Sequence, residues 1–356
     1  MTGTSSSQAS RPPRAASGAA LGLASAALFG ASTPVAKLLV PGTGPLVFAG
    51  LLYAGAGLGL VAARAFRRGG AEAPIRRSDL PVLAAAIVSG GIVGPLLLVL
   101  GLARLSGLTA SLLLNLEAPC TIALAVLFLG ERLSRREALG AGAVVAGAAI
   151  LSWAPGPLEV DPVGAACVAG ACVAWAIDSN LNQRLSLRDP VAVARAKALF
   201  AGPFNVALGL AVGERLPSLA RTGAALVTGS LGYGASVVLF LLAVRSLGAA
   251  RQAAYFATAP FVGAALAIPL LGERPLPVHL AAGGLMALGT VVMARSRHAH
   301  AHVHEPVEHE HAHVHDAHHA HAHDGPVAEP HSHVHRHERL AHDHPHLPDV
   351  HHRHEH

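Results

Sequence analysis

The feature that most constrains this chain is a series of uninterrupted apolar runs, each about as long as a bilayer is thick. A transmembrane helix needs about 20 consecutive apolar residues. We expect ten runs to be membrane-spanning helices. They are residues 18–40, 44–63, 80–103, 107–129, 137–154, 163–183, 191–212, 223–244, 250–271 and 278–294.

The pattern inside these runs argues against a water-soluble fold and against a membrane barrel. A helix that faced water would show a polar stripe at a period of 3.6 residues, and segments such as LVTGSLGYGASVVLFLLAV show none. Barrel strands are about 10 residues of alternating polarity, which these runs are not. Only 13% of the residues are charged, whereas soluble domains usually carry about 25%. The sequence therefore predicts an all-α membrane protein whose first partner is the lipid bilayer.

The distribution of arginine predicts the orientation, because positive charge is retained on the cytoplasmic side. One set of loops and both flanks carry most of the arginines. The other set carries Arg104, Arg215, Arg221 and Arg274. We therefore expect both termini in the cytoplasm and an even number of spans in the cell (inner or plasma) membrane. Anionic headgroups are the natural counter-charge for these arginines, so no nucleic-acid partner is expected. A homodimer is left open.

The chain also repeats itself. The stretch GLTASLLLNLEAPCTIALAVLFLGER, from Gly107, resembles GAARQAAYFATAPFVGAALAIPLLGER, from Gly248, and Pro119 matches Pro260. A repeat of five spans, an odd number, places the second copy upside down, as in many secondary transporters. The expected organisation is a disordered N-terminus (1–17), a first five-helix repeat (18–154), a second (155–296) and a histidine-rich tail (297–356).

Two five-helix halves, each with a proline-bearing fourth helix that ends in LGER, resemble the EamA-type drug/metabolite transporter superfamily. This resemblance implies a ten-helix bundle with a central cavity. It also implies exchange or ion-coupled transport without ATP. The sequence agrees, because it contains no GxxxxGK[ST] phosphate loop.

Two acidic residues within spans are the first candidates for a site, since a charge in the membrane is costly unless it is paired, protonated or hydrated. Glu117 is predicted to be a proton-coupling or cation-binding carboxylate, with Asn115 beside it. The alternative is a protonated side chain bonded to a neighbouring helix. Asp178, followed by Asn180 and Asn182, could line the inner mouth of the cavity, or it could reach the interface or pair with Arg184.

Other polar, aromatic and proline residues within spans have weaker claims. Trp175, Tyr255 and Thr258 could contact a substrate, although packing is their commoner fate. Lys37 could meet an anionic substrate or simply reach the headgroups. Proline frees backbone carbonyls inside a membrane. The remaining candidates are therefore hinges or plain kinks at Pro34, Pro119 and Pro260.

The tail has a different composition, because from His298 onward it holds 23 of the 24 histidines. With little apolar surface to bury, it is expected to be disordered. The i, i+2 spacing lets imidazoles converge on one zinc, nickel, cobalt or copper ion, and we expect the tail to bind such a divalent metal. No other cofactor is expected. The predicted ligands are His298, His300, His302, His304, His309, His311, His313, His315, His318, His319, His321, His323, His331, His333, His335 and His337.

These features favour a secondary transporter of a small metabolite or drug-like solute that works by alternating access. Two alternatives stay open. One is a transition-metal transporter fed or regulated by the tail, and the other is a membrane-anchored metal store or sensor. We find no nucleophile and base pair, HExxH motif or cofactor loop in the sequence, and so we expect no enzyme.

Overall fold

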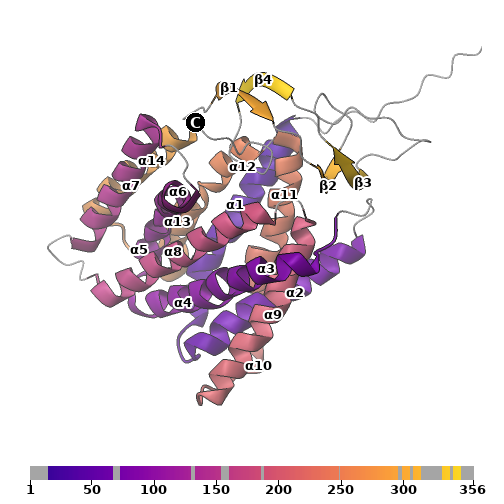
Figure 1. Cartoon of the computed structure of the whole chain (residues 1–356). Helices are drawn as coiled ribbons and strands as arrows, with labels where there is room; N and C mark the ends of the chain where they lie inside the picture. The colour runs from indigo at the N-terminus through magenta and orange to yellow at the C-terminus, as the bar shows by residue number, and fades with distance from the viewer. Residues whose placement is uncertain are drawn as a thin grey trace, which may run out of the picture.

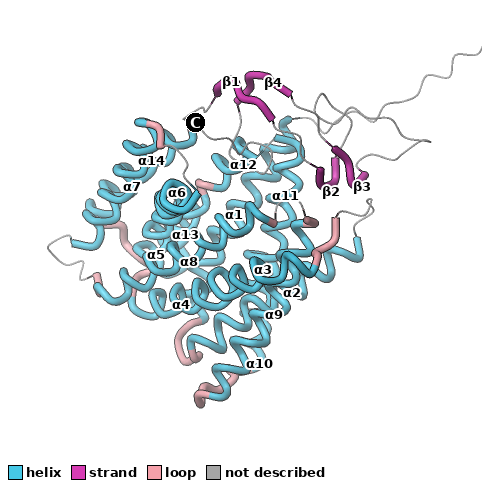
Figure 2. Tube along the Cα trace, viewed as in Figure 1, coloured by secondary structure: helices cyan, strands magenta, loops and turns pink. Residues whose placement is uncertain are grey.

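The computed structural model describes residues 15–66, 73–129, 133–153, 160–185, 188–247, 249–295, 299–304, 308–313, 331–336 and 340–345. All of the regular secondary structure described between residues 15 and 295 is helical, and the strands that are described lie in the tail (Figure 2). The expectation of an all-helical membrane region is confirmed.

Nine helical stretches within the described residues are long and apolar enough to cross a membrane. Several are made of shorter segments joined end to end. The segments are α1 (Ala15–Leu39), α2 (Pro45–Phe66), η1 (Arg77–Asp79), α3 (Leu80–Ala86), η2 (Ile87–Val93), α4 (Gly94–Arg104), α5 (Gly107–Leu113), η3 (Leu114–Leu116), α6 (Glu117–Leu129), α7 (Arg135–Trp153), α8 (Pro162–Arg184), α9 (Pro190–Ala211), α10 (Leu219–Gly229), η4 (Ser230–Ala235), α11 (Ser236–Leu247), α12 (Ala249–Phe256), α13 (Ala259–Leu271) and α14 (Pro277–Ala294).

Helix α7 occupies the position of the expected fifth span, but it is not among the nine. Its first turn carries Arg135, Arg136 and Glu137, which lower its apolar character. The count of ten spans is therefore not confirmed.

Several helix boundaries follow from capping residues in the sequence. Asp189 accepts hydrogen bonds from the amides of Val191 and Ala192, and Pro190 stands at the first position of α9. Ser106 accepts from the Thr109 amide and begins α5. These side chains satisfy amides that have no partner within the helix. At a helix C-terminus, α13 ends at Gly272, whose φ of 65° is the left-handed conformation that favours glycine.

The two halves are interrupted at matching places. In the third span of the first repeat, η2 is a π-helix, and in the third span of the second repeat, η4 is another. The fourth span of each repeat also breaks, at the 3₁₀ turn η3 in the first and at the turn between α12 and α13 in the second. The break in each repeat immediately precedes the matching proline, so Glu117 stands where the second repeat has Thr258.

Helix contacts reproduce the repeat in space (Figure 1). The second helices of the two halves, α2 and α9, pack together, and so do the fifth helices, α7 and α14. The third span of each half packs on the first span of the other, through α4 with α8 and α1 with α11. Equivalent helices of the two halves therefore make equivalent contacts, as expected for two five-helix units related by a pseudo-twofold axis.

Glycine permits the closest of these approaches. A Cβ atom on Gly140 of α7 would lie 2.7 Å from the Gly289 carbonyl oxygen, and one on Gly289 of α14 would lie 2.5 Å from that of Gly140. Small residues let membrane helices approach closely where the hydrophobic effect does not drive their association. The glycine spacing of the fifth helices thus serves the contact between repeats.

The described parts of the tail form strands, so the expected disorder is not confirmed. Strand β1 (Ala299–His304) pairs antiparallel with β4 (Leu340–Pro345), and β2 (Glu308–His313) pairs with β3 (His331–Arg336). Histidines stand opposite histidines in the register, as in His302 with His342 and His311 with His333. The alternation of histidine with other residues has the period of two that a strand requires.

Candidate functional site

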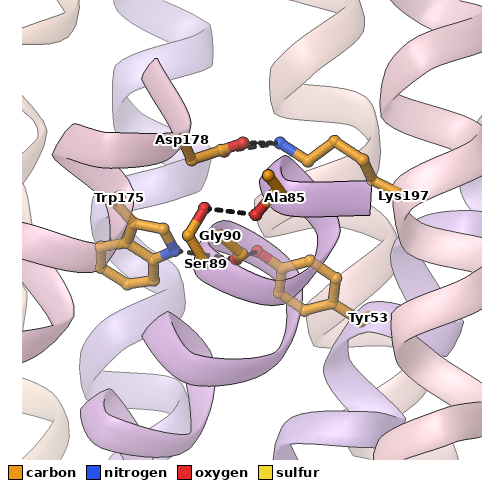
Figure 3. Close-up of polar contacts among 7 residues, drawn as sticks. All are labelled: Tyr53, Ala85, Ser89, Gly90, Trp175, Asp178 and Lys197. Carbon is orange, nitrogen blue, oxygen red and sulfur yellow. Dashed lines mark hydrogen bonds and ion pairs between the residues drawn. The ribbon is translucent and has the colours of Figure 1, made fainter. Parts of the chain in front are cut away.

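Two backbone carbonyls of the π-helix η2 accept hydrogen bonds from side chains of both repeats, and Figure 3 shows the contacts of the first, that of Gly90. Tyr53 of α2 and Trp175 of α8 both donate to the Gly90 carbonyl, at 2.5 Å and 3.1 Å. Asn205 of α9 donates to the Gly91 carbonyl at 3.1 Å. A π-helical turn alters the regular backbone pairing and is often found at functional sites. Side chains from three helices are therefore joined to one irregular turn.

A buried ion pair lies directly against this turn. The ammonium of Lys197 on α9 contacts both carboxylate oxygens of Asp178 on α8, each at 2.5 Å (Figure 3). The two side chains are only 12% and 14% exposed. A Cβ atom on Gly90 would lie 2.3 Å from Asp178 Oδ2, so glycine is needed there for the carboxylate to fit. Asp178 thus pairs with Lys197, whereas one of the predicted alternatives was a pair with Arg184.

Glu117 adds a second acidic group to this cluster. It is the first residue of α6, directly after the break at η3, and it is half-buried. Its carboxylate lies within electrostatic range of Asp178. The cluster therefore contains two carboxylates and one ammonium group inside the bundle, with one negative charge in excess when all three are ionised.

The amides predicted to accompany these acids have mostly local partners. Asn115 is buried and donates to the Leu112 carbonyl at 2.8 Å. Asn180 donates to the carbonyls of Ala176 and Thr121, at 2.8 Å and 3.2 Å. The carbonyl oxygens of Asn180, Asn182 and Asn205 are buried without a hydrogen-bond partner among the described residues. These three amide oxygens are therefore hydrogen-bond acceptors that no donor among the described residues reaches.

Three other predicted residues, Thr258, Tyr255 and Lys37, have their contacts elsewhere in the bundle. Thr258 donates to the Tyr255 carbonyl at 2.7 Å, within the break that follows α12. Tyr255 lies against Gly22 of α1. Lys37 donates to the Leu102 carbonyl at 2.5 Å and interacts electrostatically with Glu273. The predicted partners of Lys37 were an anionic substrate or the lipid headgroups, and the observed partner is a backbone carbonyl.

The three prolines take different positions. Pro34 lies inside α1. Pro119 and Pro260 stand near the start of α6 and α13, where a missing amide donor costs nothing. Pro119 and Pro260 therefore accompany the helix breaks, as the hinge prediction requires, while their movement is untested.

The tail histidines are described only in part. His298, His315, His318, His319, His321, His323 and His337 lie outside the described residues. The other predicted ligands belong to strands β1 to β3. Within the described residues, no group of three or more His, Cys, Asp or Glu side chains is arranged to hold a metal. Metal binding by the tail stays a prediction.

Three members of the cluster were not predicted from the sequence: Lys197, Tyr53 and Asn205. Lys197 could have been predicted, because it is a single lysine within the apolar run 191–212. Asn205 lies in the same run and had a weaker one. Tyr53 had none, since an aromatic residue in a span is most often part of the packing.

Carboxylates also join the repeats at the end of the bundle where α1 ends. Glu273 accepts from the amides of Gly107 and Leu108 at the start of α5, both at 2.7 Å. Glu214 accepts from the amides of Leu46 and Val47 at the start of α2, at 3.3 Å and 2.8 Å. An anion is stabilised at a helix N-terminus by the free amides and the helix dipole.

The opposite end of the bundle is bridged by an ion pair. Arg188 Nε donates to Asp79 Oδ2 at 2.6 Å, which links the start of the third span to the loop before α9. The Asp189 amide also donates to the Ala73 carbonyl at 2.9 Å. The described structure therefore has polar contacts between the repeats at both ends.

Comparison with known proteins identifies the architecture. The model of the EamA-like transporter family matches this chain twice, at residues 16–153 and 162–295. The chain belongs to the EamA-like transporter family. The resemblance seen in the sequence is thereby confirmed, and this EamA-like protein is a multi-pass membrane protein whose relatives are transporters.

Two curated relatives and one solved structure support the assignment. An uncharacterised transporter from Methanothermobacter thermautotrophicus is 27% identical over 278 residues, covering 73% of this chain and 80% of the relative. A probable terminal-alkyne amino-acid exporter from Streptantibioticus cattleyicolor is 28% identical over 223 residues, covering 62% and 75%. One crystal structure has a TM-score of 0.56 at 19% identity, covering 78% of this chain and 96% of that one, and it shows the fold alone.

Proposed function

We propose that this EamA-like protein is a secondary transporter that exports a small zwitterionic solute of the amino-acid class by alternating access. The observation that carries the proposal is the cluster of Glu117, Asp178 and Lys197 at the irregular turn η2. Charges of both signs inside a bundle are costly to keep. They complement a solute that itself carries an ammonium and a carboxylate group. A relative described as a probable amino-acid exporter supports this class of substrate.

Glu117 is proposed to bind the amino group of the solute in one state and a proton in the other. A carboxylate of this kind cannot hold both at once, because each neutralises the same charge. Mutually exclusive binding would make the cycle an exchange of solute for proton. The breaks before Pro119 and Pro260 would let the two halves move around the site.

The contacts between repeats fit such a cycle. Glu214 and Glu273 close one end, and Arg188 with Asp79 closes the other. Alternating access would break one set while keeping the other. From the arginine distribution, we propose that both termini are cytoplasmic, so the Glu214 and Glu273 contacts lie at the outer end.

The tail is proposed to bind a transition metal at the cytoplasmic mouth and to buffer metal or regulate the carrier. Its support is the density of histidine and the opposed histidines of the register, such as His309 with His335. Titration of Ni²⁺ and Zn²⁺ into the full chain and into a chain ending at Arg297 would measure it. Equal stoichiometry for both chains would remove the proposal.

Uptake by inverted membrane vesicles tests the transport function. Each of the twenty proteinogenic amino acids is supplied in labelled form, with the vesicle interior acidic, and Ni²⁺, Co²⁺ and Zn²⁺ are supplied separately. Uptake of at least one amino acid that Glu117→Gln abolishes and Asp161→Asn retains would support the proposal, since Asp161 is an exposed partner of Arg104. Uptake of a metal ion alone, abolished by Glu117→Gln, would replace it with the metal-transporter alternative.

A further inference from the structure

The position of Lys197 suggests a role beyond that of a counter-ion. It lies on α9, seven residues from the start of the helix, which at 1.5 Å per residue is about 10 Å inside the span. Both of its hydrogen bonds within the described part of the chain go to Asp178. An ammonium group has three N–H donors. At least one donor is therefore left for a further acceptor.

The neighbouring charges indicate which acceptor fits. On one side of Asp178 lies Lys197, and Glu117 is near enough to Asp178 for their charges to interact. A zwitterion placed between Glu117 and Lys197 would give an alternating series of charges: Glu117, the ammonium of the solute, its carboxylate, Lys197 and Asp178. Each charge would then have an opposite neighbour, which lowers the cost of every ionised group in the membrane.

We propose that Lys197 is the anchor for the carboxylate of the transported solute, and that Asp178 is the positioning residue that holds the Lys197 ammonium in place through two hydrogen bonds. This inference rests on the proposed export of an amino-acid-like solute and adds the residue that would select for the carboxylate. Gly90 lies against the carboxylate of Asp178, and the Gly90 carbonyl accepts hydrogen bonds from Tyr53 and Trp175 (Figure 3). Asp178 is therefore packed between Lys197 and a turn that two other helices anchor.

A single substitution of Lys197 would not test this idea, because it leaves Asp178 as an unpaired buried charge. The useful variant is the double substitution Lys197→Gln with Asp178→Asn, which removes both charges and keeps two hydrogen-bonding side chains. If the pair were only structural, this neutral variant would transport every substrate as the wild type does. If Lys197 binds the carboxylate, the neutral variant would fold but lose one kind of substrate.

The test compares the amino acid that wild-type vesicles transport best with its carboxamide and its decarboxylated amine, which keep the ammonium group and lack the carboxylate. In the neutral double variant, the KM for the amino acid should rise by about tenfold or more, the value of one lost charged hydrogen bond, while KM for the two analogues changes by less than about twofold. Lys37→Met is the matched control, since Lys37 is another lysine in a span and bonds to the Leu102 carbonyl. It should leave the ratio of KM values unchanged.

Three other results would overturn the inference. Equal KM changes for the amino acid and both analogues would show a general disturbance of the site. Unchanged KM values would show that Lys197 serves Asp178 alone. Wild-type vesicles that transport no amino acid would remove the proposed function and this inference together. Elution of each variant as one peak in size exclusion, with a melting temperature near that of the wild type, would exclude misfolding.

Discussion

The two repeats share one architecture but differ in the chemistry at their equivalent breaks. In the first repeat, the carbonyls of η2 accept hydrogen bonds from Tyr53, Trp175 and Asn205, and the break in the fourth span begins α6 with Glu117. In the second repeat, the break carries Thr258, which bonds within its own turn. The helix breaks are thus a property of the fold, while a carboxylate at the break in the fourth span is found in the first repeat.

The π-helices show the same difference. Directly after η4, Ser236 and Ser25 exchange hydrogen bonds, each donating to the carbonyl of the other at 2.8 Å and 2.9 Å. This contact joins α1 and α11 without a charged group. The ion pair of Asp178 and Lys197 lies beside η2. Symmetry of the backbone therefore does not require symmetry of the site, and substitutions at equivalent positions should have unequal effects.

The largest contrast is expected between Glu117→Gln and Thr258→Val. Glu117→Gln removes the carboxylate proposed to bind the amino group of the solute or a proton. A hydrogen bond to a charged group is worth about 1.5–3 kcal/mol, so amino-acid uptake should fall by roughly tenfold or more. Thr258→Val removes one local hydrogen bond, worth about 1 kcal/mol, and should change uptake far less. Initial rates in inverted vesicles, normalised to protein amount, measure both. Equal losses would mean that the two breaks contribute alike.

The next contrast concerns glycine at the π-helix. Gly90→Ala forces a Cβ atom against Asp178, where the nearest oxygen lies 2.3 Å away, and overpacking of this kind costs about 1–3 kcal/mol. Gly284→Ala is the control, because a Cβ there meets nothing within 4 Å. Thermal unfolding in detergent should show a lower Tm for Gly90→Ala and a near-normal Tm for Gly284→Ala. A normal Tm and normal uptake for Gly90→Ala would argue against a tightly packed ion pair.

A smaller effect is expected when a single hydroxyl donor, that of Tyr53 or of Ser236, is removed. Tyr53→Phe deletes the hydrogen bond to the Gly90 carbonyl, and Ser236→Ala deletes the one to the Ser25 carbonyl, each worth about 0.5–1.5 kcal/mol of stability. Both should lower Tm slightly, but only Tyr53→Phe should also raise the KM for the amino acid, because it borders the site. Kinetics and melting curves on the same preparations separate the two effects. A KM change with Ser236→Ala alone would place the site beside η4 instead of beside η2.

The smallest effect on transport should come from the tail. A chain that ends at Arg297 keeps every contact described in the bundle, so its uptake of amino acid without added metal should match the full chain. With Ni²⁺ or Zn²⁺ added, only the full chain should respond if the tail regulates the carrier. A lower rate for the shortened chain in metal-free buffer would show that the tail supports the bundle itself.

Much of the fold could be predicted from the sequence because it depends on the type of side chain. Apolar runs identify the spans, and matching residues such as Pro119 and Pro260 identify the repeat. The acids of the site were visible for the same reason, since Glu117 and Asp178 interrupt apolar runs. The carbonyl of Gly90 was not visible, because a π-helical turn has no side-chain signature. The partner of Asp178 was missed although Lys197 is the single lysine in its span. The strands of the tail were missed because its period of two was taken as spacing on a flexible chain.

The proposed exchange of a solute for a proton at Glu117 can be measured through the pH inside proteoliposomes. Purified protein is reconstituted with an internal pH indicator, and the best-transported amino acid is added outside without any imposed gradient. Entry of the amino acid should drive protons out, so that the internal pH rises with the wild type and does not change with Glu117→Gln. The same alkalinisation with Glu117→Gln, or amino-acid uptake by the wild type without any change of internal pH, would contradict the proposed exchange.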